Sequence, residues 1–300
     1  MKKLEWETIF KNTTFFIVDN EIEDYYQEEI DKRIKKISTQ INSLVDKDGV
    51  LNFIKSDKDS LSTLITLLGI SGERFNRIVS MIRVSYGHIF ESEWNSSSGM
   101  RNKLLANPQI LNDVCELFKN GSSNEKFKVM IPNLILQKFH IDSKTLKRVG
   151  DTEFLRELVQ VKLNTEYNTK YKDAYHNLIF SKIQPIAFKY GLEISENTIP
   201  EGCSYPAMLI LKAGSKQIIV NESYNLTTGQ GQTTYQGKLA EMYKVVRDNP
   251  DTLLINILDG AGWIARGSDC KQIYHNCHQF LNLKTIDYIE QIITDFYNIY

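Results

Sequence analysis

The first half of the chain carries apolar residues at the spacing of amphipathic helices. Residues 21–45 place apolar side chains three or four positions apart, with charges of both signs on the other face. Residues 59–83 continue this spacing on both sides of a short break at Gly69, and Ser71 stands where the N-cap of a second helix is expected. The pattern predicts an α-helical region over residues 1–150.

The apolar period changes from helical to strand-like after Gly191, where a helix predicted over 171–190 ends. Short β-rich runs bounded by Gly, Pro and Asn follow at 192–195, 205–212, 216–224 and 252–260. A helix that stops before Pro250 separates the last two runs, and the C-terminal segment predicts helix, short strand and helix. This order predicts an α/β domain over residues 151–300, with helices flanking both faces of a mixed β-sheet.

Composition restricts the class of protein more than its function. A chain of 300 residues with 42% hydrophobic and 24% charged residues is typical of a soluble globular protein. No apolar run is long enough to span a membrane, so no membrane association is expected. Four cysteines without an apolar leader indicate reduced thiols and a cytoplasmic location. A net charge of −1 is compatible with nucleic-acid binding only through a local basic face.

One such face is predicted within the helical region. Arg74 and Arg77 line the second helix of the pair in 59–83, and a helix, short turn and basic helix is the outline of a helix-turn-helix. This interpretation makes residues 1–150 a DNA-recognition region. The alternative is a plain helical hairpin whose basic face is solvated.

A lone carboxylate stands near the end of the central predicted hairpin. If the turn near Gly214 pairs residue 212 with 216, Ala207 lies beside Asn221 or Glu222. Metal-dependent nucleases bring carboxylates together at such a place, because a divalent metal polarises the phosphate and activates the attacking water. Magnesium takes oxygen ligands, which carboxylates on neighbouring strands can supply.

The second half of the chain resembles the PD-(D/E)XK type II restriction endonucleases, and more narrowly their GATC-cutting group, over about residues 165–300. The residues that carry the likeness are Pro206, Glu222, "SYNLTTGQGQ" (223–232), "DGAGW" (259–263) and "DAYHNLI" (173–179). The resemblance implies a restriction-endonuclease-like sheet and Mg²⁺-dependent hydrolysis of phosphodiester bonds in a specific duplex DNA sequence. It also implies a dimer, homomeric or heteromeric, that reads a palindrome.

The resemblance implies an altered catalytic site. The first acid of the family is Ala207 here, the strand glutamate falls on Ser223 with Glu222 one residue away, and the helix glutamate is His176. Asn225 stands where the family more often has lysine. The implied site residues, with Glu222 as metal ligand, are His176, Ala207, Asn221, Glu222, Ser223 and Asn225.

These departures leave several alternatives open. Glu222 can replace the strand glutamate only if a bulge re-aims it, because one residue of slip turns a side chain to the other face. Ala207 could be an engineered change, or one of Glu193, Glu196 and Glu201 could supply the acid. A naturally degenerate site would make the chain an inactive DNA-binding paralogue, or the non-cutting subunit of a heteromeric enzyme. An all-helical protein-interaction module is a more distant alternative.

A polar loop after the third strand is the second candidate for DNA contact. Its amides and hydroxyls can bond bases and phosphates, and Lys238, which opens the next helix, can contact a phosphate. The predicted contacts are Thr227, Thr228, Gln230, Gln232, Thr233 and Lys238. The alternative is a flexible polar loop without a ligand. For Asp259, after the last long strand, a capping or turn role is expected.

Overall fold

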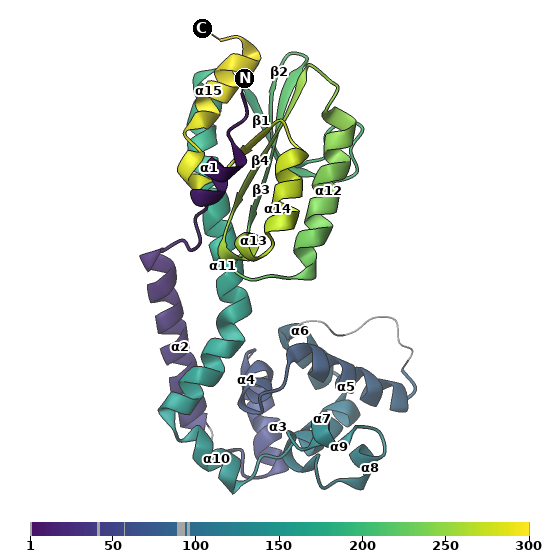
Figure 1. Ribbon diagram of the computed structural model, residues 1–300. Helices are drawn as coiled ribbons and strands as arrows, with labels where there is room; N and C mark the ends of the chain where they lie inside the picture. The colour runs from purple at the N-terminus through teal and green to yellow at the C-terminus, as the bar shows by residue number, and fades with distance from the viewer. Residues whose placement is uncertain (1, 41–42, 57, 89–93, 95–96, 300) are drawn as a thin grey trace. The chain divides into compact units, whose positions relative to one another are not determined.

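The chain, in a computed structural model that describes residues 2–40, 43–56, 58–88, 94 and 97–299, forms two compact units (Figure 1). The sheet unit comprises residues 1–22 and 166–300, and the helical unit comprises residues 23–165. A boundary near residue 150 was expected from the sequence, whereas the contacts divide the chain between residues 165 and 166. Residues 1–22 belong to the sheet unit, although they precede the helical unit in sequence.

The helical unit contains the predicted helix pair. Its helices are α2 (Asn20–Gln40), which begins just before the boundary, α3 (Lys47–Ser56), α4 (Ser60–Leu67), α5 (Gly72–Ser85), α6 (Ser97–Leu105), α7 (Pro108–Asn120), α8 (Glu125–Lys128), α9 (Asn133–Leu136) and α10 (Ser143–Val149). Ser71 caps α5 as predicted, since its side chain accepts a hydrogen bond from the Arg74 backbone N–H over 3.2 Å. Phe75 of α5 stacks on Phe118 of α7, with ring centroids 5.3 Å apart, and so ties the pair to the core.

The helix before the first strand is longer than predicted. α11 (Thr152–Lys189) begins nineteen residues before Tyr171 and ends, as expected, next to Gly191, whose φ of 64° favours glycine. Its first part repeats buried residues every fourth position, at Leu155, Val159 and Leu163, a spacing that holds one helix face inward. Among the described residues, no helix is both long and apolar enough to cross a membrane.

The sheet unit contains the predicted mixed sheet. Its strands are β1 (Glu193–Thr198), β2 (Ala207–Ala213), β3 (Lys216–Tyr224), β4 (Thr252–Asp259) and β5 (Gln279–Leu281), in the order β1-β2-β3-β4-β5. The first three strands are antiparallel, and β4 and β5 run parallel to β3. The β2–β3 turn pairs Ala213 with Lys216, one residue from the register expected, and Gly214 takes a positive φ of 59°.

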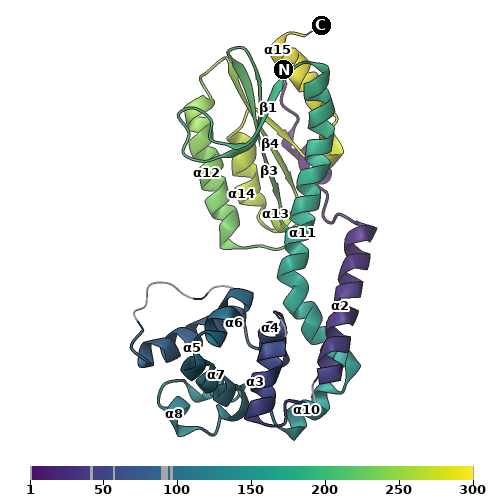
Figure 2. The same ribbon diagram turned by 180° about the vertical axis from the view of Figure 1, so that it is seen from behind.

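Helices cover both faces of this sheet, as predicted (Figures 1 and 2). The remaining helices of the unit are α1 (Trp6–Lys11), α12 (Gln230–Val246), α13 (Ala261–Ala265), α14 (Gly267–His275), the 3₁₀ turn η2 (Leu283–Thr285) and α15 (Tyr288–Tyr297). One apolar layer packs α11 and α15 against the sheet, and a second packs α12 and α14 against the other face. Val220 belongs to the first layer and Ile219 to the second, so β3 alternates between them.

α12 begins earlier than expected, and this changes the predicted polar loop. Gln230, Gln232 and Thr233, which the sequence placed in the loop, form the first turn of the helix. Gly229 is its N-cap residue, and the backbone N–H of Gly229 donates to the Gln232 side chain over 3.0 Å. The error has a physical reason: the Gly and Thr residues of this segment have low helix propensity, and a tertiary setting overrides it.

Candidate functional site

Glu222 and His176 form the central pair of the candidate site. β3 pairs with β4 residue by residue from Gln217 to Tyr224, with Glu222 opposite Ile257 and no bulge between. The alternation of β3 therefore turns Glu222 toward α11, the helix that carries His176. The Glu222 Oε1 atom lies 2.8 Å from His176 Nδ1. The structure thus unites two predicted site residues that are 46 positions apart in the sequence.

The Glu222 carboxylate is desolvated and only partly paired. Its side chain is 15% exposed, and burial raises the pKa of Glu222, an effect that the hydrogen bond to His176 and the electrostatic attraction of that ring partly offset. Its second oxygen, Oε2, is buried and has no hydrogen-bond partner among the described residues. The Tyr235 hydroxyl of α12 donates to the backbone carbonyl of Glu222 over 2.6 Å and fixes the strand at this point.

Glu196 completes a line of three titratable side chains. His176 Nε2 lies 3.9 Å from Glu196 Oε2, on the side away from Glu222, and the histidine side chain is 32% exposed. Glu196 belongs to β1, where it pairs with Leu209 of β2. It is one of the three glutamates considered as alternative acids from the sequence. No short stretch of sequence identifies Glu196 as a site residue, because its closeness to His176 depends on how α11 packs.

The other predicted residues of the catalytic strand lie on the opposite face. The Asn221 amide, in the layer of α12, donates to Met242 Sδ over 3.3 Å. Ser223 Oγ accepts from the Asn225 side chain over 2.8 Å and from the Trp263 indole N–H over 3.2 Å. Ser223 and Asn225 thus form a structural network with Trp263. The structure does not bring them together with Glu222.

Ala207 packs in a different apolar layer from the one toward which Glu222 points. It is 1% exposed and belongs to the apolar layer that contains Leu239 and Met242 of α12. The α11 layer, toward which Glu222 points, does not include it among the described residues. A carboxylate at this position would enter an apolar core. Of the residues expected to form the catalytic site, the structure therefore unites His176 and Glu222.

Asp259 connects three separate segments of the sheet unit. One of its oxygens accepts from the Thr14 backbone N–H over 2.6 Å, and the other accepts from the Leu283 N–H over 2.7 Å and the Tyr175 hydroxyl over 3.1 Å. Burial raises the pKa of Asp259 to about 6, although these hydrogen bonds act in the opposite direction. The expected turn role is therefore part of a larger, structural one.

The Gly-x-Gly of "DGAGW" lets the segment after β3 pack on the end of β4. Gly260 has a φ of 107°, and a Cβ there would lie 2.3 Å from the Asn225 carbonyl oxygen. A Cβ on Gly262 would lie 2.4 Å from the carbonyl oxygen of Thr227. The Gly262 N–H donates to the Asn225 carbonyl over 2.8 Å. The two glycines thus allow the backbone at the start of the predicted DNA-binding segment to pack closely against the end of β4.

The predicted DNA-binding residues after β3 differ in accessibility. Gln232 is only 3% exposed and serves as a cap of α12, so its side chain is not presented to a ligand. Thr233 accepts from Arg266 Nη1 over 2.7 Å, which brings an arginine to this turn that the sequence analysis did not single out. Five of the predicted residues are exposed: Thr227, Thr228, Gln230, Thr233 and Lys238. The Lys238 ammonium lies over the ring of Tyr205, 4.9 Å from its centroid.

The protein supplies few metal ligands around the Glu222–His176 pair. Over the described ranges, no group of three or more His, Cys, Asp or Glu side chains has the geometry to hold a metal ion. Among the described residues, Glu222 Oε2 is a buried carboxylate oxygen at the site that lacks a partner. A cation there would need oxygen ligands from a substrate phosphate and water.

Comparison with known proteins does not assign this chain to a family. A scan against protein-family models and a search of curated proteins found no match to this chain. The conclusions on function therefore come from the fold, from the Glu222–His176 pair and from the exposed polar residues beside it.

Proposed function

We propose that the chain is a Mg²⁺-dependent endonuclease of the PD-(D/E)XK type II restriction kind, which binds a specific duplex DNA sequence. The observation that carries this proposal is Glu222, a largely buried carboxylate near the end of a central strand. One of its oxygens contacts His176, and the other has no partner among the described residues. The order of α11, the antiparallel β1–β3 and the parallel β4 along the chain supports the proposal. A two-fold dimer, of identical or related chains, would read a palindrome.

The site offers one or two protein carboxylates to a magnesium ion. Mg²⁺ is often held by one or two carboxylates together with substrate phosphates and water. Glu222 Oε2 would be the first ligand, and Glu196, whose Oε2 lies 3.9 Å from His176 Nε2, is a second carboxylate at the site. When bound, the metal would supply charge stabilisation for the phosphate and lower the pKa of the attacking water.

His176 is placed to move a proton. Glu222 accepts at Nδ1, so the neutral ring that donates Nδ1–H carries its lone pair on Nε2. This nitrogen lies on the partly exposed side of the ring, next to Glu196, where it can take a proton from water. Glu222 would thus orient the base, and the exposed Thr227, Thr228, Gln230 and Lys238 would hold the DNA backbone nearby.

A second candidate function is a DNA-binding protein that does not cut, either an inactive paralogue or the non-cutting subunit of a heteromeric restriction enzyme. The observation in its favour is the position of Ala207, which packs into the α12 layer and leaves Glu222 without a carboxylate from β2. Such a protein would keep the polar and basic surface but would not need a metal.

Cleavage and binding assays on the same variants separate these functions. Supercoiled plasmid and labelled duplex fragments would be incubated with the chain, Glu222→Gln and a control, Asp248→Asn, which neutralises a carboxylate that is 85% exposed. We expect Glu222→Gln to lose at least about a hundredfold in cleavage rate, a typical effect of removing a group that acts on the reacting atoms. Salt-dependent duplex binding should be unchanged in all three proteins.

Each outcome decides between the candidates. Discrete Mg²⁺-dependent fragments from the chain and Asp248→Asn, but not from Glu222→Gln, would support the nuclease. Salt-sensitive binding without any cleavage would support the non-cutting function. If neither binding nor cleavage occurs while the melting temperature of the chain shows it to be folded, both functions are wrong.

A further inference from the structure

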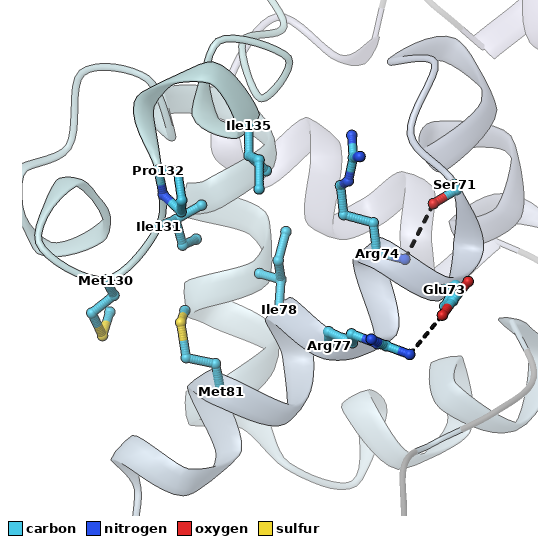
Figure 3. A pocket seen from close by; sticks show the side chains of 10 residues that line it. All are labelled: Ser71, Glu73, Arg74, Arg77, Ile78, Met81, Met130, Ile131, Pro132 and Ile135. Atoms are coloured by element: carbon cyan, nitrogen blue, oxygen red, sulfur yellow. Dashed lines mark hydrogen bonds and ion pairs between the residues drawn. The ribbon is translucent and has the colours of Figure 1, made fainter.

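A pocket of about 450 Å³ opens on the surface of the helical unit (Figure 3). Its volume lies in the range of small-molecule and cofactor sites. One side is formed by α5, and the other by the segment from Met130 to Ile135 that leads into α9. The pocket is lined by Ser71, Glu73, Arg74, Arg77, Ile78, Met81, Met130, Ile131, Pro132 and Ile135.

The lining divides into an apolar floor and a charged rim. Ile78, Met81, Pro132 and Ile135 lie around the hollow in Figure 3, Met130 lies at its outer edge, and the polar side chains lie toward the start of α5. The two arginines differ in availability. Arg77 is paired with Glu73 over 2.6 Å, but the guanidinium of Arg74 has no ion pair or hydrogen bond among the described residues. The rim has a net positive charge, because it carries two arginines and one glutamate.

The chemistry of this lining suits a flat group attached to an anion. Two methionines on opposite sides are polarizable and adaptable, and they contact aromatic faces favourably. The planar guanidinium of Arg74 matches the geometry of a phosphate and can bind it in bidentate fashion. A purely aliphatic ligand would use the floor but not Arg74, and an inorganic anion would use Arg74 but leave the floor in water.

We propose that this pocket binds a single nucleotide, with its base on the methionine floor and its phosphate on Arg74. The choice of a nucleotide over another flat anion rests on the proposed function, which brings DNA to the protein. The ligand has two sources with the same chemistry, a free mononucleotide or an unpaired nucleotide of a DNA strand. In either case the helical unit would read a nucleotide through a pocket, in addition to any groove contact by α5.

Methyl NMR of selectively labelled methionines tests the pocket directly. The full chain would be titrated with deoxyadenosine 5′-monophosphate, and the Met81 and Met130 methyl signals should shift in the ring current of the base. Arg74→Gln should weaken this binding by about tenfold or more, as expected for one charge-assisted contact. Arg247→Gln removes an exposed arginine from the sheet unit and should leave the binding unchanged.

Three further probes identify what the pocket recognises. Deoxyadenosine lacks the phosphate and should bind to the chain as weakly as the monophosphate binds to Arg74→Gln. A duplex with one unpaired adenine should shift the same methyl signals, and a fully paired duplex should not, if DNA is the source. Shifts with the mononucleotide alone would identify a free nucleotide as the ligand.

The inference is overturned if hexyl phosphate binds more tightly than the mononucleotide, or if millimolar mononucleotide leaves the Met81 and Met130 signals in place. Its failure is distinguishable from failure of the proposed function. Plasmid cleavage without nucleotide binding would remove the pocket inference alone. Arg74-dependent nucleotide binding without cleavage would remove the nuclease and keep the pocket.

Discussion

Lowering the pH from 7 to 5 should stabilise the sheet unit through Asp259. Burial raises the pKa of this carboxyl to about 6 in the folded protein, from an ordinary value of 3.8. Between these two values the folded state holds the proton more tightly than the unfolded state. The free energy of unfolding must therefore fall as the pH rises through this window, and rise as the pH is lowered.

The magnitude follows from the size of the shift. A difference of about two pKa units corresponds to about 3 kcal/mol between the acid and neutral limits. Between pH 7 and pH 5 only the folded carboxyl titrates appreciably, so the expected gain is about 1 kcal/mol. The raised pKa of the buried Glu222 adds to the gain in the same direction.

The assay is urea unfolding at pH 5 and pH 7, with Trp94→Phe as background so that Trp6 and Trp263 of the sheet unit report by fluorescence. Asp259→Asn should be less stable at both pH values, by about 1–3 kcal/mol for each buried donor left unpaired. It should also lose the part of the pH dependence that belongs to Asp259.

The comparison of the two slopes decides the result. If the chain and Asp259→Asn change by the same amount between pH 5 and pH 7, the pKa of Asp259 is not raised. If the chain is instead less stable at pH 5 by more than the variant, the hydrogen bonds from Thr14, Leu283 and Tyr175 outweigh burial and hold the carboxylate ionised.

Three further changes test the packing around the site. Ala207→Asp should destabilise the sheet unit by about 3 kcal/mol or more in urea unfolding, because it buries a carboxyl in an apolar layer, and it should not increase plasmid cleavage. Gly262→Ala should cost about 1–3 kcal/mol and weaken duplex binding, since its Cβ would lie 2.4 Å from the Thr227 carbonyl oxygen. Tyr235→Phe should cost about 1 kcal/mol by removing a hydrogen bond of 2.6 Å to the β3 backbone.

Controls and contrary outcomes are available for each change. A gain of cleavage in Ala207→Asp would place that side chain beside Glu222 after all. Gly237→Ala is the control for Gly262→Ala, because a Cβ at Gly237 would meet no atom of the described residues within 4 Å. This change should stabilise α12 by up to about 1 kcal/mol. An unchanged free energy of unfolding in Tyr235→Phe would mean that the hydroxyl bonds water equally well.

The sequence alone determined the order of the elements and the faces that they bury. The four β-rich runs, the end of α11 beside Gly191 and the Ser71 cap of α5 were all expected, because they depend on neighbouring residues and on the alternation of apolar positions. Such local patterns also predicted a mixed sheet covered on both faces. The start of α12 was placed too late, since tertiary packing carries that helix through Gly and Thr residues of low propensity. The first part of α11 was missed although its apolar residues have helical spacing.

Only the tertiary structure decided which side chains meet. The pairing of His176 with Glu222, the closeness of Glu196 to His176 and the three hydrogen bonds to Asp259 join residues far apart in the chain. Ala207 was expected beside the strand carboxylate, yet it packs into the other face. A periodic pattern encodes whether a side chain points inward. Its partners depend on the twist of the sheet and on how each helix lies across it, which no short stretch of sequence specifies.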